Sequence, residues 1–430
     1  MSNKIKVGVF GAARGKTMIN ILLNHPDAEL VAVCDKYVPL LKEVGELAQA
    51  KQIKVALYES FDEFFKQDMD AVVLANYGNE HAPFAIRLLH SGRHVLSEVL
   101  PCETMSQAVA LIEAVEKTGL VYSYAENYCY MNHTFEMMRR YQDGDIGDIM
   151  YAESQYIHDC SACWPDITYG ERTHWRNHLY STFYCTHSIG PVLTISGHRP
   201  VQVVGFETQP LQSMIDVGNV RGSAGVELLT LDNGAIVKSV HGALKMEPPG
   251  VNYEVYGTKG MLCNERSSGK VISYIEGPEV CKGERTVYEP EQSVSPELAQ
   301  RFGSHGGSDF YATHFFLEKI LGRPEGTKYG IDVYSAVDMG ICGILAYRSI
   351  LNGNQPVHIP NLRNKEEREA YRQDHACTNA AVAGEQLLPV CSRGVLDVPD
   401  ETYARARQKW LDHVAEKEEA DHAGKSSHCQ

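Results

Sequence analysis

The sequence lacks three features that would place the protein in a membrane or on a nucleic acid. No apolar run approaches the roughly 20 residues that a bilayer-spanning helix needs. The first residues, MSNKIKVGVFG, contain no apolar core followed by a cleavage site. Lysine and arginine number 40 against 55 acidic residues, a formal net charge of −15. Because polyphosphate binding needs a basic face, we expect neither a nucleic-acid partner nor a membrane partner.

Disulfide and metal signatures are also missing. The 12 cysteines are scattered through apolar or mixed segments, which favours free thiols in a reducing cytoplasm over a disulfide framework. Cys160 and Cys163 form a CxxC pair, but no second pair accompanies them. The histidines at 174, 178 and 187 do not match HExxH or a three-ligand zinc pattern. We therefore predict a cytoplasmic protein without a bound metal.

The N-terminal residues follow the order of a dinucleotide-binding unit. An apolar strand over 4–11 ends in glycine, a tight turn opens a helix, and a second strand over 29–34 is followed by Asp35. Backbone N–H groups at the start of such a helix face the pyrophosphate. An acid at Asp35 is placed to accept hydrogen bonds from the adenosine ribose. Its carboxylate would repel a 2′-phosphate, so we predict NAD rather than NADP.

The glycine turn itself is degenerate. Gly11 stands at the first glycine position of a GxGxxG pattern, but Ala13 and Lys16 occupy the second and third. Dinucleotide binding is therefore favoured by the complete order of strand, turn, helix, strand and acid. A plain strand–helix–strand unit without a ligand is the alternative.

Polar residues recur where the later strands of this region end. Strands predicted over 70–76, 93–99 and 119–126 alternate with helices over 81–91 and 104–118, which is typical of an α/β, doubly wound parallel sheet. Ligands of such sheets lie beyond the carboxyl ends of the strands. The polar groups at these ends are Asn76, Gly78, Asn79 and His81, then Glu98 and Val99, then Glu126 and Asn127. We expect them to form one site.

The pattern changes after about residue 130. Several runs alternate polar with apolar residues, as in an open antiparallel sheet with one face toward solvent. These runs cover 149–157, 200–207, 224–231, 235–242 and 252–257. We predict an NAD-binding Rossmann domain over 1–127, a substrate-binding α/β domain with an open, mostly antiparallel sheet over 128–364, and a helical C-terminal extension over 365–430.

A dense polar and aromatic stretch lies between the first of these strands and the rest. Residues 156–190 combine aromatic platforms with hydrogen-bonding groups, which suits contacts to a sugar or to a cofactor better than a metal site. The stretch includes His158, Asp159, Trp164, His174, Trp175, Arg176, His178, Tyr180, Tyr184 and His187. A purely structural aromatic cluster is the alternative.

Together these motifs resemble the Gfo/Idh/MocA group of NAD(P)-dependent proteins over roughly residues 4–362. The ordinary oxidoreductases of that group carry a catalytic lysine in a Glu-Lys-Pro motif, whereas this chain has Val99 after Glu98. Glycoside hydrolase family 109, whose members are NAD-dependent glycosidases acting on N-acetylgalactosaminides, is similar in showing Glu-Val. Further segments similar to that family are 126–130, 156–159, 174–178, 184–192 and 305–310.

The resemblance implies roles for individual residues. Those implied to be catalytic are Tyr156, Tyr184, His187 and Glu126. Those implied to bind substrate are Arg176, His174, His178, His305 and Asp309. Those expected to hold NAD are Arg14, Gly15, Asp35, Gly78, Asn79, His81, Glu98, Val99 and Asn127, together with the turn, strand-end and aromatic residues Gly11, Ala13, Asn76 and Trp175.

The residue types suit an elimination rather than ordinary glycoside hydrolysis, which needs two carboxylates. Transient oxidation at C3 of the sugar would acidify the C2 proton, Tyr156 would remove that proton, the C1 leaving group would depart, and water addition and re-reduction would follow. A tyrosine base needs a nearby positive charge, from the nicotinamide or a protonated His187. Tyr184 and His187 are predicted to share a helix face and serve the C3 hydroxyl or leaving group.

Two other functions stay open. A sugar dehydrogenase or 3-keto-sugar-forming oxidoreductase would use another base, such as His187, and would release reduced cofactor. A non-enzymatic NAD-binding regulator is the third interpretation, disfavoured by the many ionisable groups at one predicted site. The expected partner is a small-molecule glycoside or sugar, and the resemblance implies a homo-oligomer, either a dimer or a tetramer.

Overall fold

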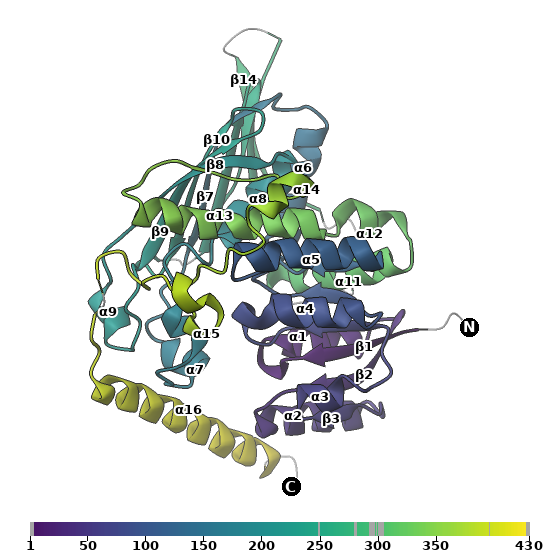
Figure 1. The fold of residues 1–430 in the computed structure, drawn as a ribbon. Coiled ribbons are helices and arrows are strands. Elements are labelled where there is room, and N and C mark those ends of the chain that lie inside the picture. The colour runs from purple at the N-terminus through teal and green to yellow at the C-terminus, as the bar shows by residue number, and fades with distance from the viewer. Residues whose placement is uncertain are drawn as a thin grey trace.

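The computed structural model describes residues 4–247, 250–278, 282–291, 297, 299, 305–394 and 396–426 (Figure 1). Its N-terminal part is a six-stranded parallel sheet in the order β3-β2-β1-β4-β5-β6, which confirms the predicted doubly wound Rossmann sheet. The strands are β1 (Ile5–Phe10), β2 (Ala28–Cys34), β3 (Ala56–Tyr58), β4 (Ala71–Leu74), β5 (His94–Ser97) and β6 (Tyr122–Tyr124). The helices are α1 (Ala12–Leu22), α2 (Val38–Ala50), α3 (Phe61–Phe64), α4 (His81–His90) and α5 (Met105–Thr118).

The second part is a nine-stranded sheet in the order β14-β13-β12-β11-β7-β10-β9-β8-β15. All neighbouring strands are antiparallel except β7 and β10, so the predicted open, mostly antiparallel sheet is confirmed. The strands predicted from sequence are β7 (Ile149–Ile157), β8 (Pro200–Glu207), β9 (Ala224–Leu231), β10 (Ile236–Gly242) and β11 (Gly250–Gly257). Four more extend it: β12 (Gly260–Asn264), β13 (Val271–Glu276), β14 (Gly283–Tyr288) and β15 (Val357–His358).

Helices cover one face of this sheet and connect it to the Rossmann part (Figure 1). Those packed on the sheet are α6 (Asn132–Gln142), α8 (Thr186–Ser196) and α13 (Val333–Leu351). Helix α11 (Ser308–Ile320) contacts α1 and α12 (Pro324–Tyr329), and α7 (Trp164–Thr168) and α9 (Gln212–Ile215) are short helices between strands. By length and composition, Pro324–Leu351 is long and apolar enough to cross a membrane. The prediction that no apolar run approaches such a length was therefore wrong. However, 72% of the apolar window in this segment is buried within the protein, because α13 packs between β8 and α5.

Short 3-10 helices place several of the predicted site residues. They are η1 (Gly78–Glu80), η2 (Asn127–Tyr130), η3 (Trp175–His178), η4 (His305–Gly307) and η5 (Gly384–Gln386). The first two directly follow the ends of β4 and β6, where the chain leaves the parallel sheet. The polar groups at those strand ends therefore lie at the edge where ligands of such sheets bind.

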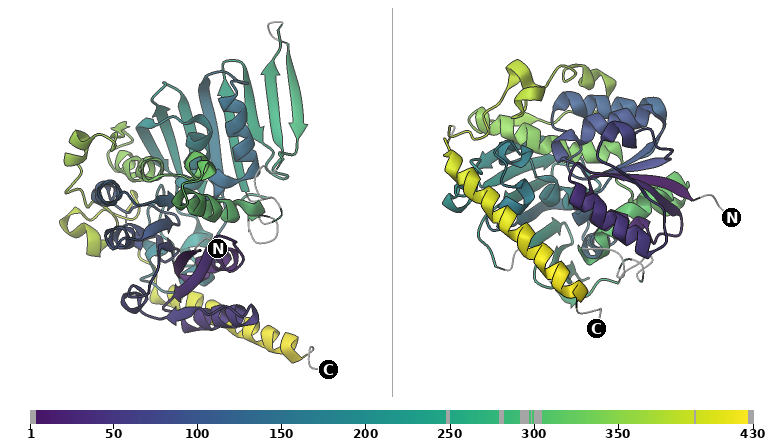
Figure 2. Two further views of the ribbon diagram at one scale, coloured as in Figure 1. Left: turned by 90° about the vertical axis from the view of Figure 1, so that its right-hand side faces the viewer. Right: turned by 90° about the horizontal axis from the view of Figure 1, so that it is seen from below.

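The C-terminal segment packs along the body of the protein. It contains α14 (Lys365–Glu369), α15 (Ala380–Ala383) and the long α16 (Asp400–Ser426). Figure 2 shows α16 crossing the underside of both parts, toward the N-terminal helices. It contacts α7, and Lys417 near its end lies 3.5 Å from Glu43 of α2. The domain boundaries at 127/128 and 364/365 stay predictions.

A buried arginine ties this segment to the Rossmann part. The Arg368 side chain is 1% exposed and bonds both carboxylate oxygens of Glu116 on α5, at 2.7 and 2.5 Å. We expect Arg368→Met to lower the free energy of unfolding by about 2–3 kcal/mol, because it removes both bonds from the arginine and leaves Glu116 with only the Tyr334 hydroxyl as partner. Urea unfolding followed by circular dichroism measures this change.

The matched control is Arg372→Met. Arg372 pairs with Glu113 on the same helix, but both side chains are 39% exposed. Its loss is expected to change the free energy of unfolding little, because solvent screens this pair. Equal effects of the two substitutions would contradict the anchoring role of Arg368.

Candidate active site

The turn after β1 brings the predicted nucleotide-binding residues together. Gly11 has a φ of 97°, and a Cβ there would come within 2.3 Å of the Ala75 backbone at the end of β4. The Asp35 carboxylate accepts hydrogen bonds from the N–H groups of Ala12 at 2.7 Å and Tyr37 at 2.8 Å. The acid at the end of β2 is therefore held against the start of α1, where the ribose of a dinucleotide lies in this fold.

The structure explains the degenerate glycine pattern. Gly15 is buried, and a Cβ on it would lie 2.9 Å from the Val9 side chain, so Gly15 allows α1 to pack closely on β1. That is the role of the third glycine in the regular pattern, displaced here by one residue. Ala13 and Lys16 are exposed, and Lys16 pairs with Glu43 at 2.5 Å.

The 76–81 loop forms a second wall. His81 is buried and lies between the carbonyl oxygens of Leu100 at 3.1 Å and Asn76 at 3.3 Å, and burial lowers its pKa to about 4. A Cβ on Gly78 would lie 2.9 Å from the Trp175 ring and 3.0 Å from the Val99 carbonyl oxygen. Gly78 therefore permits close approach between this loop, the Val99 backbone and Trp175.

Two amide oxygens of this loop have no protein partner among the described residues. The Oδ1 atoms of Asn76 and Asn79 are buried without a hydrogen bond. A buried amide oxygen without a donor is unfavourable. The loop is therefore suited to a ligand that donates hydrogen bonds.

An arginine bridges two acids between α1 and α11. Arg14 Nη2 lies 2.7 Å from Glu98 Oε1 and 2.6 Å from Asp309 Oδ1, and both acids are nearly fully buried. Burial raises the pKa of Glu98 and Arg14 opposes that rise. Asp309, expected to bind substrate, and Arg14 and Glu98, expected to bind cofactor, thus form one ionic group.

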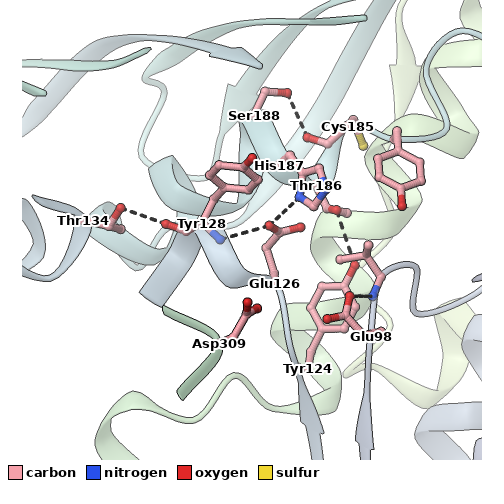
Figure 3. A network of polar contacts seen from close by, with 12 residues as sticks. Glu98, Tyr124, Glu126, Tyr128, Thr134, Cys185, Thr186, His187, Ser188 and Asp309 are labelled. Atoms are coloured by element: carbon pink, nitrogen blue, oxygen red, sulfur yellow. Dashed lines mark hydrogen bonds and ion pairs between the residues drawn. The ribbon is translucent and has the colours of Figure 1, made fainter. Parts of the chain in front are cut away.

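A buried histidine and glutamate form the centre of the site (Figure 3). His187 Nδ1 lies 2.6 Å from Glu126 Oε1, and the two side chains are 8% and 0% exposed. Glu126 Oε1 also accepts the Tyr128 N–H at 3.3 Å, and Asn127, which opens η2, is buried. The carboxylate accepts the hydrogen bond from Nδ1–H and so holds that form of the imidazole, which leaves Nε2 available for proton transfer.

Three tyrosine rings surround His187. Ring centroids of Tyr128 and Tyr156 each lie 4.8 Å from the imidazole, and that of Tyr184 lies 5.1 Å away. The prediction that Tyr184 and His187 share a helix face is wrong in its local structure. Tyr184 lies in the turn before α8, which begins at Thr186, and the turn rather than the helix directs its ring toward His187.

Arg176 is the fixed positive charge of this cluster. Its Nη2 donates to Tyr184 Oη at 3.3 Å, and its guanidinium lies 4.6 Å from the Trp175 ring centroid. Burial raises the pKa of Tyr156 well above its ordinary value, and Arg176 acts to lower it. Any tyrosinate in the site therefore depends on a neighbouring cation.

The structure does not bring every predicted residue into this cluster. His174 packs against Tyr77 and accepts the Arg176 N–H at 3.3 Å, and burial lowers its pKa to about 3. The His178 side chain is exposed at the end of η3. The side chain of His305 lies outside the described residues.

Sequence reasoning missed two contributors. Tyr128 directly follows Glu126 and Asn127, which were predicted to end a strand at the site. Its position next to this pair could therefore have indicated that it lies in the site. Tyr253 on β11 donates from its hydroxyl to the His187 carbonyl oxygen at 2.7 Å, and nothing in the sequence connects these two residues.

A group of potential metal ligands lies elsewhere among the described residues, on α11 and α12. Ligand atoms of His314, Glu318 and Glu325 lie within 4.8 Å of one another. Glu318 is already paired with Arg323 at 2.5 Å. The group is therefore no part of the site around His187.

Known proteins are similar to this chain in sequence and in fold. Residues 5–126 match the Gfo/Idh/MocA oxidoreductase family, described by its NAD-binding Rossmann fold. Glycosyl hydrolase family 109 protein 1 of Phocaeicola vulgatus is 25% identical, covering 83% of each chain, and a family 109 protein of Porphyromonas gingivalis is 24% identical, covering 83% of this chain and 84% of its own.

The fold has solved counterparts. A levoglucosan dehydrogenase in complex with NADH superposes with a TM-score of 0.68 at 14% identity, covering 84% of this chain and all of that one. With the six-stranded sheet and the turn at Gly11, these comparisons identify the N-terminal domain as an NAD-binding Rossmann domain. Residues 5–126 thus resemble the Gfo/Idh/MocA oxidoreductases, and over most of its length the chain is similar to glycosyl hydrolase family 109 proteins.

Proposed function

We propose that the protein is an NAD-dependent glycoside hydrolase with no net redox change. The observation that carries this proposal is the His187–Glu126 pair surrounded by Tyr128, Tyr156 and Tyr184 beside the Rossmann strand ends. Similarity to family 109 glycosyl hydrolases along 83% of the chain supports it.

The residues present fit a dinucleotide. Gly11 and Gly78 let the turns after β1 and β4 pack closely at the edge of the sheet, Asp35 would meet the ribose, and Asn76 and Asn79 offer unpaired oxygens to a hydrogen-bond donor such as the carboxamide. When bound, NAD would supply reversible hydride transfer with C3 of the sugar, and the C3 ketone formed between the two transfers would make the C2 proton acidic. Protein side chains would carry out the proton transfers.

We assign C2 deprotonation to Tyr156 and proton donation to the departing C1 oxygen to His187. The Tyr156 phenolate takes the C2 proton. The electron pair of the former C2–H bond forms the C1–C2 double bond, and the C1–O bond breaks with its electron pair going to the leaving group. Glu126 stabilises the imidazolium that His187 needs as a donor. Tyr184, bonded to Arg176, is positioned for the C3 hydroxyl.

The neighbouring acids argue against ordinary two-carboxylate hydrolysis. Glu126 is bonded to His187, and Glu98 and Asp309 are both paired with Arg14. Direct hydrolysis requires one protonated and one free carboxyl across the glycosidic bond. A sugar dehydrogenase with His187 as base is the second candidate, because the same imidazole could take the C3 hydroxyl proton.

Absorbance at the NADH band during turnover separates these candidates. Incubation with a panel of α- and β-glycosides is expected to release free sugar without net NADH. Stoichiometric NADH without glycosidic cleavage would overturn the hydrolase proposal and favour the dehydrogenase.

The cofactor preference depends on Asp35. We expect Asp35→Asn to weaken NAD binding by about tenfold to a hundredfold, because it removes a charged acceptor for the ribose hydroxyls, and to narrow the preference for NAD over NADP. Titration calorimetry with both cofactors measures the ratio. Glu43→Gln on α2 is the control that should leave it unchanged, and an unaltered ratio in Asp35→Asn would contradict the ribose role.

We also propose that the open face of the nine-stranded sheet is the homo-oligomer interface. Phe206, Leu228 and Ile236 are about 40% exposed on the neighbouring strands β8, β9 and β10. Exposed large apolar side chains gathered on one sheet are typical of protein contacts. Sedimentation equilibrium distinguishes a dimer or tetramer from a monomer.

A further inference from the structure

Two arginines from separate segments lie near each other: Arg221 lies against the Trp164 ring, and Trp164 Nε1 donates to Asn177 Oδ1, next to Arg176, at 2.8 Å. Arg176 lies in η3 and donates to Tyr184 Oη at 3.3 Å. Arg221 lies in the loop between α9 and β9, with its Nη1 3.5 Å from the Tyr180 carbonyl oxygen. Its guanidinium also lies 5.7 Å from the Trp164 ring centroid. Both side chains are partly buried.

Neither arginine has a carboxylate partner among the described residues. Within that part of the chain, no Asp or Glu oxygen lies within 4.0 Å of either guanidinium. The side chains whose charges would influence the pKa of both arginines are instead Cys160 and Tyr184. Other shielded arginines of this protein do pair with acids: Arg14 with Glu98 and Asp309, Arg348 with Asp374, and Arg368 with Glu116.

Among the described residues, no carboxylate compensates the charges of Arg176 and Arg221. The hydrogen bond with Cys160 lowers the pKa of Cys163 to about 7. The hydrogen bond with Cys163, together with burial, raises the pKa of Cys160, so this thiol stays neutral. Burial and then the charge of Arg176 act to lower the pKa of Arg221 to about 10. The protein has more acidic residues, 55, than basic residues, 40. These two guanidinium groups nevertheless repel each other without a carboxylate partner among the described residues, which destabilises the folded protein.

We propose that Arg221 and Arg176 bind an oxyanion carried by the substrate, so that the glycoside cleaved is an anionic sugar, either a uronide or a sugar sulfate. The inference rests on the proposed function in one respect: the sugar occupies the cluster of Tyr156, Tyr184 and His187. Guanidinium groups bind carboxylate and sulfate oxygens with strong charge-assisted hydrogen bonds. Arg221 would thus determine specificity, whereas Arg176 also serves Tyr184.

Equilibrium binding to the NAD-loaded protein tests this proposal without turnover. Titration calorimetry compares galacturonate and glucuronate with galactose 6-sulfate, and with galactose and glucose as neutral controls. We expect at least one anionic sugar to bind about tenfold or more tightly than its neutral counterpart. Tighter binding of the uronates assigns the site to a carboxylate, and tighter binding of the 6-sulfate assigns it to a sulfate ester. Equal or weaker binding of every anionic sugar overturns the proposal.

Arg221→Met tests the residue itself. Removing the charge while keeping an apolar side chain is expected to weaken binding of the anionic sugar about tenfold to a hundredfold, and binding of the neutral sugar less than threefold. Arg221→Lys should restore part of the affinity. Arg266→Met is the matched control, because Arg266 bonds Gln155 at 2.6 Å and also has no carboxylate partner among the described residues. Equal losses for both sugars in Arg221→Met would overturn the assignment, and the lysine variant serves if the methionine variant does not fold.

The two proposals fail separately. If neutral glycosides are cleaved and anionic sugars bind no better, the anionic-substrate inference is wrong and the glycosidase proposal stands. If no glycoside is cleaved while anionic sugars still bind through Arg221, the glycosidase proposal is wrong and the oxyanion site stands.

Discussion

Tyr156→Phe is expected to lower the rate of glycoside cleavage about 10³-fold, because it removes the proposed base for the C2 proton. The ring, and with it the packing 4.8 Å from His187, would remain. Oxidation at C3 would still proceed, so the variant should form NADH in a single turnover and then stop. Rapid-mixing absorbance and product chromatography measure the two steps on one sample.

Tyr151→Phe is the matched control for this substitution. Tyr151 lies on the same strand, β7, but an odd number of residues away, so its side chain is on the opposite face, where its hydroxyl bonds Glu153 at 2.7 Å. We expect its activity to equal that of the unmodified protein. If Tyr156→Phe retained full cleavage, Tyr156 would not be the base, and Tyr184, which receives a hydrogen bond from Arg176, would become the candidate.

Glu126→Gln is expected to lower cleavage by about 10²–10⁴-fold. The amide oxygen can still accept the His187 Nδ1–H across 2.6 Å, but the charge that supports the imidazolium is lost. Melting temperature and NAD affinity should change little, which separates a chemical effect from a folding effect.

A double-mutant cycle sharpens this prediction. If Glu126 acts through His187, the double variant Glu126→Gln/His187→Gln should be no slower than His187→Gln alone, because groups that act as a unit are not additive. Multiplication of the two losses would contradict a shared proton-donor role and would favour an independent contact of Glu126 with the sugar.

The local parts of the fold could be predicted from sequence. The first strand, turn, helix and second strand follow one another within 35 residues, so their pattern is complete in one window. Glu126 at a strand end was found by the same reasoning. The sequence did not reveal that Gly15 takes the role of the third glycine, because that role depends on how closely α1 approaches Val9.

The contacts between distant segments could not be predicted from periodicity. Glu126 and His187 are 61 residues apart, and only the placement of α8 against η2 brings them to 2.6 Å. Residue spacing placed Tyr184 on the helix, whereas the helix begins two residues later. The position of Arg221 depends on a loop whose sequence contains no motif, so no signal could have found it.

The position of α16 shows the same limit. Its charged, helix-prone sequence predicted a helix but not a location. In the structure the ring centroid of Trp410 on this helix lies 6.2 Å from that of Tyr37, whose N–H bonds Asp35. The superposition with the solved levoglucosan dehydrogenase covers all of that chain but 84% of this one. The other residues of this chain therefore have no counterpart in that dehydrogenase.

The exchange of the C2 hydrogen with solvent tests the central claim most directly. The NAD-loaded protein is incubated in D₂O with a glycoside that it cleaves, and the released sugar is analysed by mass spectrometry and NMR. Elimination followed by water addition predicts one deuterium at C2 and no net NADH. Cleavage that leaves hydrogen at C2 would contradict the elimination mechanism, whatever residues surround the sugar.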